Sequence, residues 1–357
     1  MNLSEFDYSL PKNFIAQKPL NQRDNSKLIV LDRKTQSIDH HHFYDLPDLL
    51  DSNTVLVFNE SRVIPARLLF KIGEINAEIL LIKPLSNSKW ECVVRPGKKF
   101  KEGVEIKVDD ELSCHVESIT EHGLRVIRFD CEDLNSYLKS HGHTPLPPYI
   151  KEEIDNPEKY QTIYSKTEGS VAAPTAGFHF TDEVFKKLKE KGIQTEFVTL
   201  HVGLGTFQPV KTDNVLEHKM HSEWFELSPD VADRLNKAKE NGKKIVAVGT
   251  TSIRVLESCA MPVRNRHACS LQAQSGETDI FIYPGYKWKF IDHLITNFHV
   301  PKSTLLMLVS AFADPANVGE TSESSLQTGR DFIITAYEEA KKQNYRFFSF
   351  GDSMMIK

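Results

Sequence analysis

The fold class is decided by residues 228–260, which read SPDVADRLNKAKENGKKIVAVGTTSIRVLESCA. Ser228 and Pro229 suit the first positions of a helix, and Gly242 suits the position after the last turn, so a helix is predicted over residues 230–241. The apolar run KIVAVG then predicts a buried strand, and GTTS begins a further helix. Helix, strand and helix in succession predict α/β packing in this part of the chain.

The same alternation continues on the N-terminal side. Thr181 precedes the acid-first segment DEVFKKLKEK (182–191), which stops at Gly192, and this layout predicts a helix with both ends marked. The apolar run EFVTLHVG (196–203) follows as a strand. Further strands are predicted at LIVLDR (28–33) and NTVLVFN (53–59).

A different pattern occupies the chain between Arg67 and Pro147. Short runs of alternating apolar and polar residues follow one another with turn residues between them, which predicts an all-β module of about 80 residues. These runs are EILLIKPL, WECVVRP, VEIKV, LSCHVESI and LRVIRFD. Four prolines between Pro145 and Pro157 mark the return to mixed structure.

These patterns predict an α/β protein with two domains, which is also the number expected for 357 residues at roughly 150 residues per domain. We expect a large, discontinuous mixed α/β domain formed by residues 1–66 plus 149–357. The small all-β domain, residues 67–148, is inserted at one of its loops, where insertions are readily tolerated.

Composition excludes several classes of protein. The chain has 44 Lys+Arg against 49 Asp+Glu and a net charge of −5, so any site for a polyanion must be local. Five cysteines without a C-x-x-C pair fit reduced thiols of the cytosol, and imply no structural zinc. The N-terminus has no signal-peptide pattern, and the longest apolar stretch, 305–312, is too short to span a bilayer. We therefore expect a cytoplasmic protein without membrane contact.

The polar stretch 313–329 is expected to be a mobile loop of unassigned role.

Two segments rich in glycine and small residues are candidate ligand sites. GSVAAPTAGFHF (169–180) brings His179 among small residues that let a flat ligand approach, although a tight turn with a core histidine remains the alternative. HVGLGTFQPV (201–210) lacks the third glycine and the helix of a dinucleotide loop. Its backbone amides could still contact a ribose or a carboxylate, and the candidates there are His201, Gly203, Gly205 and Thr206.

Two further segments combine polar groups with the start of an element. In AVGTTSIR (247–254) a buried strand breaks into a helix, and Thr250, Thr251 and Arg254 suit an anion, with ordinary helix capping as the alternative. In HKMHSEWFE, His218, His221 and Glu223 resemble metal ligands with a base. The H-x-x-H spacing and the lack of a third ligand favour a substrate-facing or surface cluster instead, so no metal is expected.

Aromatic and basic residues supply the remaining candidates. The block from 275 to 312 interleaves Glu277, Tyr283, Asn297 and His299 with strand-like apolar residues, and its aromatic rings suit base stacking or simply a core. Residues 62–101 hold nine Lys/Arg against three acids, which suits contact with a phosphate backbone or a solvated face. The candidates for this phosphate contact are Arg62, Arg67, Arg95, Lys98 and Lys99.

Together these blocks resemble the family of S-adenosylmethionine:tRNA ribosyltransferase-isomerases of queuosine biosynthesis. The motifs in question span nearly the whole chain: FDYSLP, IAQKPLNQRDNSKLIVLDR, NESRVIPARL, YQTIYSKTEGSVAAPTAGFHFT, HVGLGTFQPV, HKMHSE, GTTSIRVLES, IYPGYKWKFIDHLITNFHVPKSTLLMLVSAFA and YRFFSFGDSMMI. Two departures are NESR, where the family more usually has N-x-T-R, and the polar insert after SAFA; Ser61 keeps the hydroxyl. The resemblance implies a large α/β domain carrying a small β-barrel, in agreement with the patterns above.

The implied reaction moves the ribosyl part of S-adenosylmethionine onto 7-aminomethyl-7-deazaguanine at the tRNA wobble position. It gives epoxyqueuosine and releases adenine and methionine. S-adenosylmethionine is thus a co-substrate, and no other cofactor is expected. Such chemistry needs a base near the C5′ hydrogens and an acid or hydrogen-bond donor for adenine. His179, His201, Glu277 and His299 are the catalytic candidates, without assignment of base or acid.

Two other classes compete with this hypothesis. One is a non-catalytic tRNA- or nucleotide-binding protein that uses the all-β module, and the other is a metal-dependent hydrolase built on His218, His221 and Glu223. Most of the unusual polar residues lie in the α/β part, which favours an enzyme. The protein is expected to be a monomer.

Overall fold

The computed structural model describes residues 1–203, 210, 212–262, 269–317 and 328–357. They divide into two compact units. The large unit comprises residues 1–61, 148–167 and 173–357, and the small unit comprises residues 62–147 and 168–172. The expected borders of two independently folding domains, at 66/67 and 148/149, stay a prediction.

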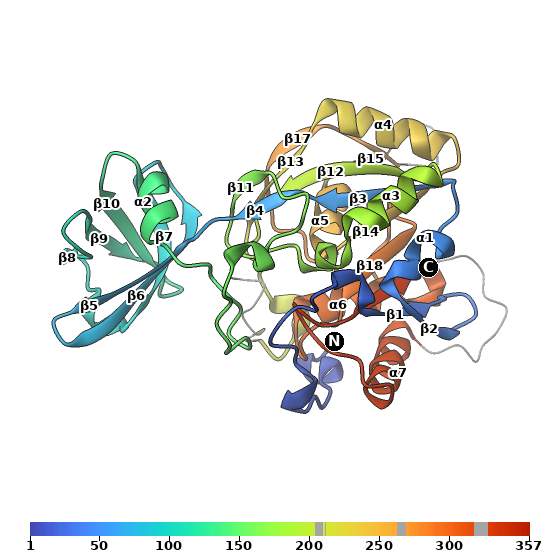
Figure 1. Ribbon diagram of the computed structural model, residues 1–357, viewed down its shortest axis with the longest axis horizontal. Helices are drawn as coiled ribbons and strands as arrows, with labels where there is room; N and C mark the ends of the chain where they lie inside the picture. The colour runs from blue at the N-terminus through green and yellow to red at the C-terminus, as the bar shows by residue number, and fades with distance from the viewer. Residues whose placement is uncertain (204–209, 211, 263–268, 318–327) are drawn as a thin grey trace. The chain divides into compact units, whose positions relative to one another are not determined.

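A nine-stranded mixed sheet forms the centre of the large unit (Figure 1). Its strand order is β17-β13-β12-β3-β14-β18-β19-β1-β2. Four neighbouring strands run parallel in its middle: β12 (Gln194–Leu200), β3 (Thr54–Asn59), β14 (Lys244–Val248) and β18 (His293–Asn297). The remaining strands are β17 (Gln274–Thr278), β13 (Glu223–Leu227), β19 (Ser353–Ile356), β1 (Lys27–Leu31) and β2 (Ile38–His42).

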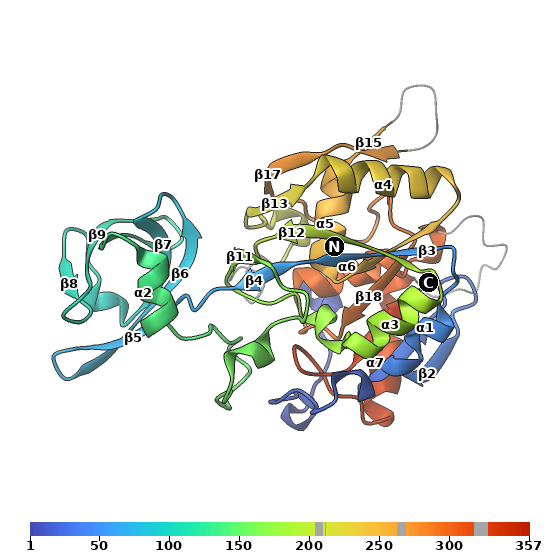
Figure 2. The ribbon, with the colours of Figure 1, turned by 45° about the horizontal axis from the view of Figure 1, so that its top comes forward.

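Helices cover both faces of this sheet, which is why the central strands β3 and β14 carry continuous apolar runs, at residues 55–58 and 245–248. Leu56 and Phe58 of β3 pack in one cluster with Val184 and Leu188 of α3 (Asp182–Glu190) and with α1 (Leu46–Leu49). Side chains alternate along a strand, so Val57 faces the other side. There α4 (Pro229–Glu240) and α5 (Thr250–Cys259) contact the same central strands (Figure 2). The helices predicted at 182–191 and 230–241 and the further helix predicted at GTTS correspond to α3, α4 and α5 and are confirmed.

The sheet brings five chain segments to one edge. Since the four central strands are parallel, the residues that follow them meet at the carboxyl edge, namely Val202, Ser61, Gly249 and His299. β19 runs antiparallel to β18 and pairs Ser353 with Asn297. The turn that precedes β19 therefore reaches the same edge, where α/β proteins commonly bind their ligands. Beyond β18 lie α6 (Thr304–Phe312) and α7 (Gly329–Lys342), which pack on each other.

The small unit contains a six-stranded antiparallel sheet in the order β5-β6-β7-β10-β9-β8. Its strands are β5 (Arg67–Ile72), β6 (Ile75–Pro84), β7 (Lys89–Arg95), β10 (Arg125–Asp130), β9 (Ser113–Ile119) and β8 (Glu105–Lys107). Alternate residues such as Ile79, Cys92, Val116 and Ile127 are buried in a barrel-like core. One helix, α2 (Leu134–His141), begins at the capping residue Asp133. The predicted fold class, mixed α/β with an inserted all-β module, is confirmed.

Short elements complete the chain: β4 (Ser61–Val63) pairs with β11 (Thr167–Ser170), and β15 (Ala260–Pro262) pairs with β16 (Cys269–Leu271). The segment 175–179 forms a single 3₁₀ turn, η7. Among the described residues, no helix combines the length and the apolar character needed to cross a bilayer. Of the polar stretch 313–329, residues 318–327 lie outside the described residues.

Candidate active site

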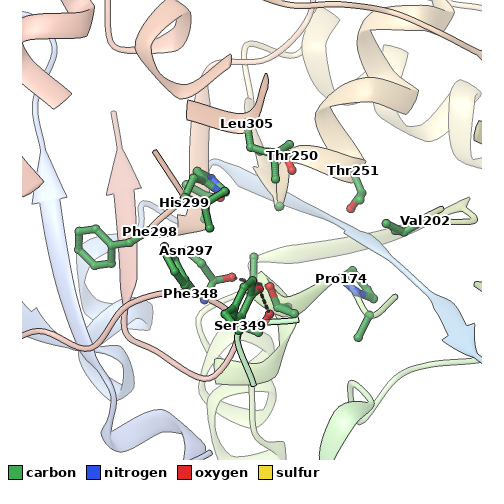
Figure 3. A pocket seen from close by; sticks show the side chains of 17 residues that line it. Pro174, Val202, Thr250, Thr251, Asn297, Phe298, His299, Leu305, Phe348 and Ser349 are labelled. Atoms are coloured by element: carbon green, nitrogen blue, oxygen red, sulfur yellow. Dashed lines mark hydrogen bonds between the residues drawn. The ribbon is translucent and has the colours of Figure 1, made fainter. Parts of the chain in front are cut away.

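A pocket lies at the carboxyl edge of the central strands (Figure 3). It is lined by residues of η7, the ends of β12, β14 and β18, the starts of α5 and α6, and the turn before β19. These are Tyr149, Ala173, Pro174, Thr175, Ala176, Val202, Gly249, Thr250, Thr251, Thr296, Asn297, Phe298, His299, Val300, Leu305, Phe348 and Ser349. None of these described lining residues is an aspartate, glutamate, lysine or arginine. The pocket is therefore built from neutral polar groups and apolar walls.

Asn297 is held in place by two neighbours at the end of β18. Its side-chain oxygen accepts a hydrogen bond from Thr175 Oγ1 at 3.0 Å, and its side-chain nitrogen lies 3.1 Å from His179 Nε2. With this orientation of the amide, His179 Nε2 is the acceptor. The other ring nitrogen, Nδ1, then donates to Ser26 Oγ at 2.7 Å. Thr175 and His179 thus fix the amide of a residue that lines the pocket.

His179 itself lies behind Asn297 and does not line the pocket. The residue is 3% exposed, and its ring packs against Phe43 with centroids 5.0 Å apart. Burial, aided by the cations Arg346 and Arg23, lowers the pKa of His179 to about 3. The ring is therefore neutral near pH 7. Of the two interpretations that the sequence left open, this placement favours the core histidine, with a defined task in orienting Asn297.

His299 does line the pocket, two residues beyond Asn297. Its Nε2 lies 3.0 Å from Thr296 Oγ1, and Nδ1 makes no hydrogen bond to any described residue. Its backbone is fixed from both sides, because its N–H donates to Tyr337 Oη and its carbonyl accepts from Tyr8 Oη. Burial lowers the pKa of His299 to about 3. A neutral imidazole, firmly placed, thus reaches the pocket.

The turn before β19 lies in the motif YRFFSFGDSMMI, none of whose residues was a site candidate, and it supplies Phe348 and Ser349. Phe348 has a φ of +70°, which is uncommon for a bulky residue. Strained backbone conformations of this kind are often found at functional sites. Asp352 holds this turn closed, because its carboxylate accepts hydrogen bonds from the amides of Arg346 and Lys27 and from the Arg346 guanidinium. Ser349 Oγ lies 2.7 Å from Tyr149 Oη.

The start of α5 opens on the pocket through Gly249, Thr250 and Thr251. Gly249 has a φ of +86°, a conformation that favours glycine. Arg254, one turn further along α5, is 5% exposed and is not among the described residues that line the pocket. Its guanidinium forms a buried ion pair with Glu223 and donates to the Thr278 carbonyl. Arg254 is thus paired with Glu223 and is not among the described residues that line the pocket, and its expected contact with an anion stays a prediction.

The remaining candidates of the large unit lie outside the pocket lining. Glu223 also accepts a hydrogen bond from the Gly203 amide at 2.8 Å. His201 stacks on Trp224 with ring centroids 4.9 Å apart, and burial lowers its pKa to about 4. Glu277 is exposed on β17 and accepts from Ser222 Oγ, and Tyr283 contacts Phe281. Gly205 and Thr206 lie outside the described residues.

The basic candidates all belong to the small unit. Arg67 pairs with Glu78 on the neighbouring strand, and Arg62 is half-buried. Arg95, Lys98 and Lys99 are exposed and form no ion pair with any described residue. These three belong to the segment 95–101, RPGKKFK, which we call the basic loop.

Arg125 braces the basic loop from the neighbouring strand β10. Its guanidinium donates to the carbonyls of Phe100 at 3.0 Å and Gly97 at 3.1 Å, and also to the carbonyl of Gly123. Phe100 is fully buried. The backbone of the loop is thus anchored while Lys98 and Lys99 extend into solvent.

The fold is that of an α/β protein with a pocket at the carboxyl edge of its sheet, the edge where such proteins commonly bind their ligands, and with exposed cations on an inserted β module. The model of the family described as queuosine biosynthesis protein matches residues 3–356. The chain belongs to this family, as its motifs predicted.

Named relatives agree with this assignment over the full length. The chain is 49% identical to the S-adenosylmethionine:tRNA ribosyltransferase-isomerase of Halothermothrix orenii, with 100% of each chain covered. It is also 49% identical to the enzyme of that name from Finegoldia magna, with 100% of this chain and 98% of the relative covered. A crystal structure of S-adenosylmethionine tRNA ribosyltransferase from Thermotoga maritima matches with 38% identity and a TM-score of 0.54, covering 99% of this chain and 100% of that one.

Proposed function

We propose that this protein is an S-adenosylmethionine:tRNA ribosyltransferase-isomerase. It transfers and isomerises the ribosyl group of S-adenosylmethionine onto 7-aminomethyl-7-deazaguanine in tRNA, forming epoxyqueuosine and releasing adenine and methionine. The observation that carries the proposal is the 49% identity to enzymes of this name over the whole chain. The pocket at the carboxyl edge supports it, because the motifs GSVAAPTAGFHF, GTTSIR, TNFHV and FFSFGD all contribute lining residues.

The pocket offers neutral groups for a substrate that is itself a cation. The reaction removes a proton from C5′ beside the sulfonium, and adenine leaves from the ribose. A buried charged side chain would be costly to desolvate in such a site unless it were paired. Asn297 and His299 are instead neutral hydrogen-bonding groups whose positions are fixed before the substrate arrives, which favours electrostatic preorganisation.

His299 and Asn297 take different tasks in this proposal. His299 Nδ1 has no described partner, so it is available to accept or donate a proton at the ribosyl group. Asn297 holds a hydroxyl of the opened ribose through its amide. His179 acts on Asn297 and is thus a positioning residue. His201, Glu277 and Tyr283 remain candidates for contacts with the larger substrate, the tRNA.

The basic loop is the proposed contact for the phosphate backbone of tRNA. Exposed cations without ion-pair partners release counterions when they bind phosphates, and therefore contribute affinity without sequence selectivity. Arg95, Lys98 and Lys99 meet this description, and the half-buried Arg62 and the paired Arg67 are further candidates for phosphate contact. Arg67 contributes less, because Glu78 already neutralises it.

The proposal includes a monomeric enzyme in the cytoplasm that uses no metal and no cofactor besides its co-substrate. The cysteines Cys92, Cys114, Cys131, Cys259 and Cys269 are all free thiols, which fits a reducing compartment. Sedimentation velocity at micromolar concentration tests the monomer, and a dimer peak would reject it.

The direct test is mass spectrometry of tRNA carrying the aminomethyl base after incubation with the protein and S-adenosylmethionine. The proposal expects the wobble nucleoside to become epoxyqueuosine, with one adenine and one methionine released for each tRNA converted. A tRNA that binds the protein but gains no mass, with no adenine released, would instead indicate the non-catalytic tRNA-binding protein.

A further inference from the structure

The start of α5 differs in its capping from the other long helices of the described chain. The helices α2, α3, α4, α6 and α7 each begin with a side chain that accepts a hydrogen bond from an amide of the first turn. These caps are Asp133, Thr181, Ser228, Ser303 and Thr328. In α5 the capping position is Gly249, which has no side chain, and no side chain caps the first turn. The amides at the start of a helix carry a partial positive charge that attracts an anion.

Two unpartnered hydroxyls stand at this helix start and border the pocket (Figure 3). The Thr250 residue is 8% exposed, and its side chain makes no hydrogen bond to any described residue. Thr251 Oγ1 is buried and has no hydrogen-bond partner among the described residues. A buried hydroxyl without a partner loses its hydrogen bonds to water and gains none in return, so most such groups in proteins are bonded. Both hydroxyls therefore indicate a bound ligand that supplies their missing hydrogen-bond partner.

The charge of the pocket narrows the chemistry of that ligand. No lysine or arginine is among its described lining residues, and Arg254 on the same helix is paired with Glu223. Among the described residues that line the pocket, the amides at the start of α5 therefore supply the partial positive charge. S-adenosylmethionine carries a sulfonium and an ammonium group, both cations, and one carboxylate. Of these three charged groups, only the carboxylate is suited to the partial positive charge of helix amides and to hydroxyl donors.

We infer that the start of α5, with Thr250 and Thr251, binds the carboxylate of the amino-acid end of S-adenosylmethionine. This inference rests on the proposed function and deepens it, because it fixes which end of the co-substrate lies at α5. The methionyl part lies at α5, and the ribosyl part extends toward Asn297 and His299.

The test compares two ligands that differ only in the carboxylate, namely S-adenosylmethionine and its decarboxylated form. Calorimetry on the wild-type protein is expected to show about ten- to a hundredfold weaker binding of the decarboxylated ligand, the range for hydrogen bonds to a charged group. The variants Thr250→Val and Thr251→Val keep the side-chain shape. They are expected to weaken S-adenosylmethionine by a similar factor and to leave the decarboxylated ligand unchanged.

Ser310→Ala is the matched control, because Ser310 Oγ in α6 is also buried without a described partner but does not line the pocket. It is expected to change neither affinity. Equal affinities of the wild-type protein for the two ligands would overturn the inference. This comparison does not depend on whether any variant folds. Variants that weaken tRNA binding and leave the preference for the carboxylate intact would place a tRNA phosphate at α5 and would also overturn it. If S-adenosylmethionine itself does not bind, the proposed function fails instead.

Discussion

The pocket of the large unit and the basic loop of the small unit differ in how they present polar groups. The described lining of the pocket carries no charged side chain, and its Asn297 and His299 are buried and fixed by hydrogen bonds. The basic loop presents Lys98 and Lys99 in solvent, while Arg125 and the buried Phe100 fix its backbone. We therefore expect short-range hydrogen-bond geometry to determine binding in the pocket. At the basic loop we expect long-range electrostatic attraction, which salt weakens, to determine binding.

The two regions should therefore respond to different perturbations. A substitution in the pocket should change the rate of the reaction with little dependence on salt. A substitution in the loop should change the affinity for tRNA with a strong dependence on salt. Variants in the pocket and variants in the basic loop can therefore separate effects on the reaction rate from effects on the affinity for tRNA.

The largest effect is expected for the two side chains that the proposed function assigns to the reacting ribosyl group. His299→Ala and Asn297→Ala should each lower single-turnover rates by roughly 10²- to 10⁴-fold, because each removes a placed proton-transfer or hydrogen-bonding group. Affinity for tRNA should stay the same at every salt concentration. Rapid-quench measurement of adenine release gives the rate. Rates within about threefold of the wild type for both variants would remove these residues from the site.

The next effect concerns stability in acid. The pKa values of His179 and His299 fall to about 3 in the folded protein, against about 6.5 for an unfolded histidine. Between these pH values the unfolded chain binds more protons, so stability is present above about pH 6.5 and is lost as the pH falls. Each histidine should contribute about 1.4 kcal/mol per pH unit in this window.

Urea unfolding between pH 7 and pH 4 measures this loss. His179→Gln should reduce the slope of the free energy of unfolding against pH, whereas His122→Gln, at an exposed position of the small unit, should leave it unchanged. Equal slopes for all three proteins would show that His179 is not buried as a neutral ring.

A smaller effect is expected for His179→Ala. The loss of its hydrogen bonds to Ser26 and Asn297 should destabilise the fold by about 1–3 kcal/mol. Turnover should fall less than in Asn297→Ala, since His179 acts only through Asn297. Melting temperature and single-turnover rate on one preparation separate stability from activity. A rate loss larger than that of Asn297→Ala, with an unchanged melting temperature, would instead make His179 catalytic.

The smallest effect is expected at the basic loop. Neutralising Lys98 and Lys99 should lower the slope of log affinity for tRNA against log salt by about 0.9 for each phosphate that the loop no longer neutralises. The affinity for S-adenosylmethionine should not change. Lys186→Ala with Lys187→Ala, two adjacent exposed lysines of α3, is the matched control. If both double variants shift the slope equally, the basic loop is only a solvated face.

Much of the fold was predictable, because helix caps, glycines and apolar periodicity are local signals. The helices at 182–190 and 229–240 and the strands β3 and β14 lie where the sequence predicted them. The site was predictable in part. Thr250 and Thr251 belong to a segment where a buried strand was expected to break into a helix, and Asn297 and His299 belong to a block in which polar residues are interleaved with strand-like apolar ones. All four line the pocket.

The rest of the pocket depends on contacts between distant segments. Phe348 and Ser349 reach it only because β19 pairs antiparallel with β18, which no local pattern reveals. Arg254 looked like a free cation, since its partner Glu223 lies 31 residues away in sequence. For His179, the flanking aromatic residues Phe178 and Phe180 were a signal of burial that the sequence did contain.

Hydrogen–deuterium exchange with each substrate added separately is the most direct test of the division between pocket and loop. S-adenosylmethionine alone should slow amide exchange in peptides that contain Thr250–Ile253 and Asn297–His299, with no change at Lys98–Phe100. tRNA carrying 7-aminomethyl-7-deazaguanine should slow exchange at Lys98–Phe100. Protection of the basic loop by S-adenosylmethionine, with the start of α5 and the end of β18 unchanged, would contradict this division.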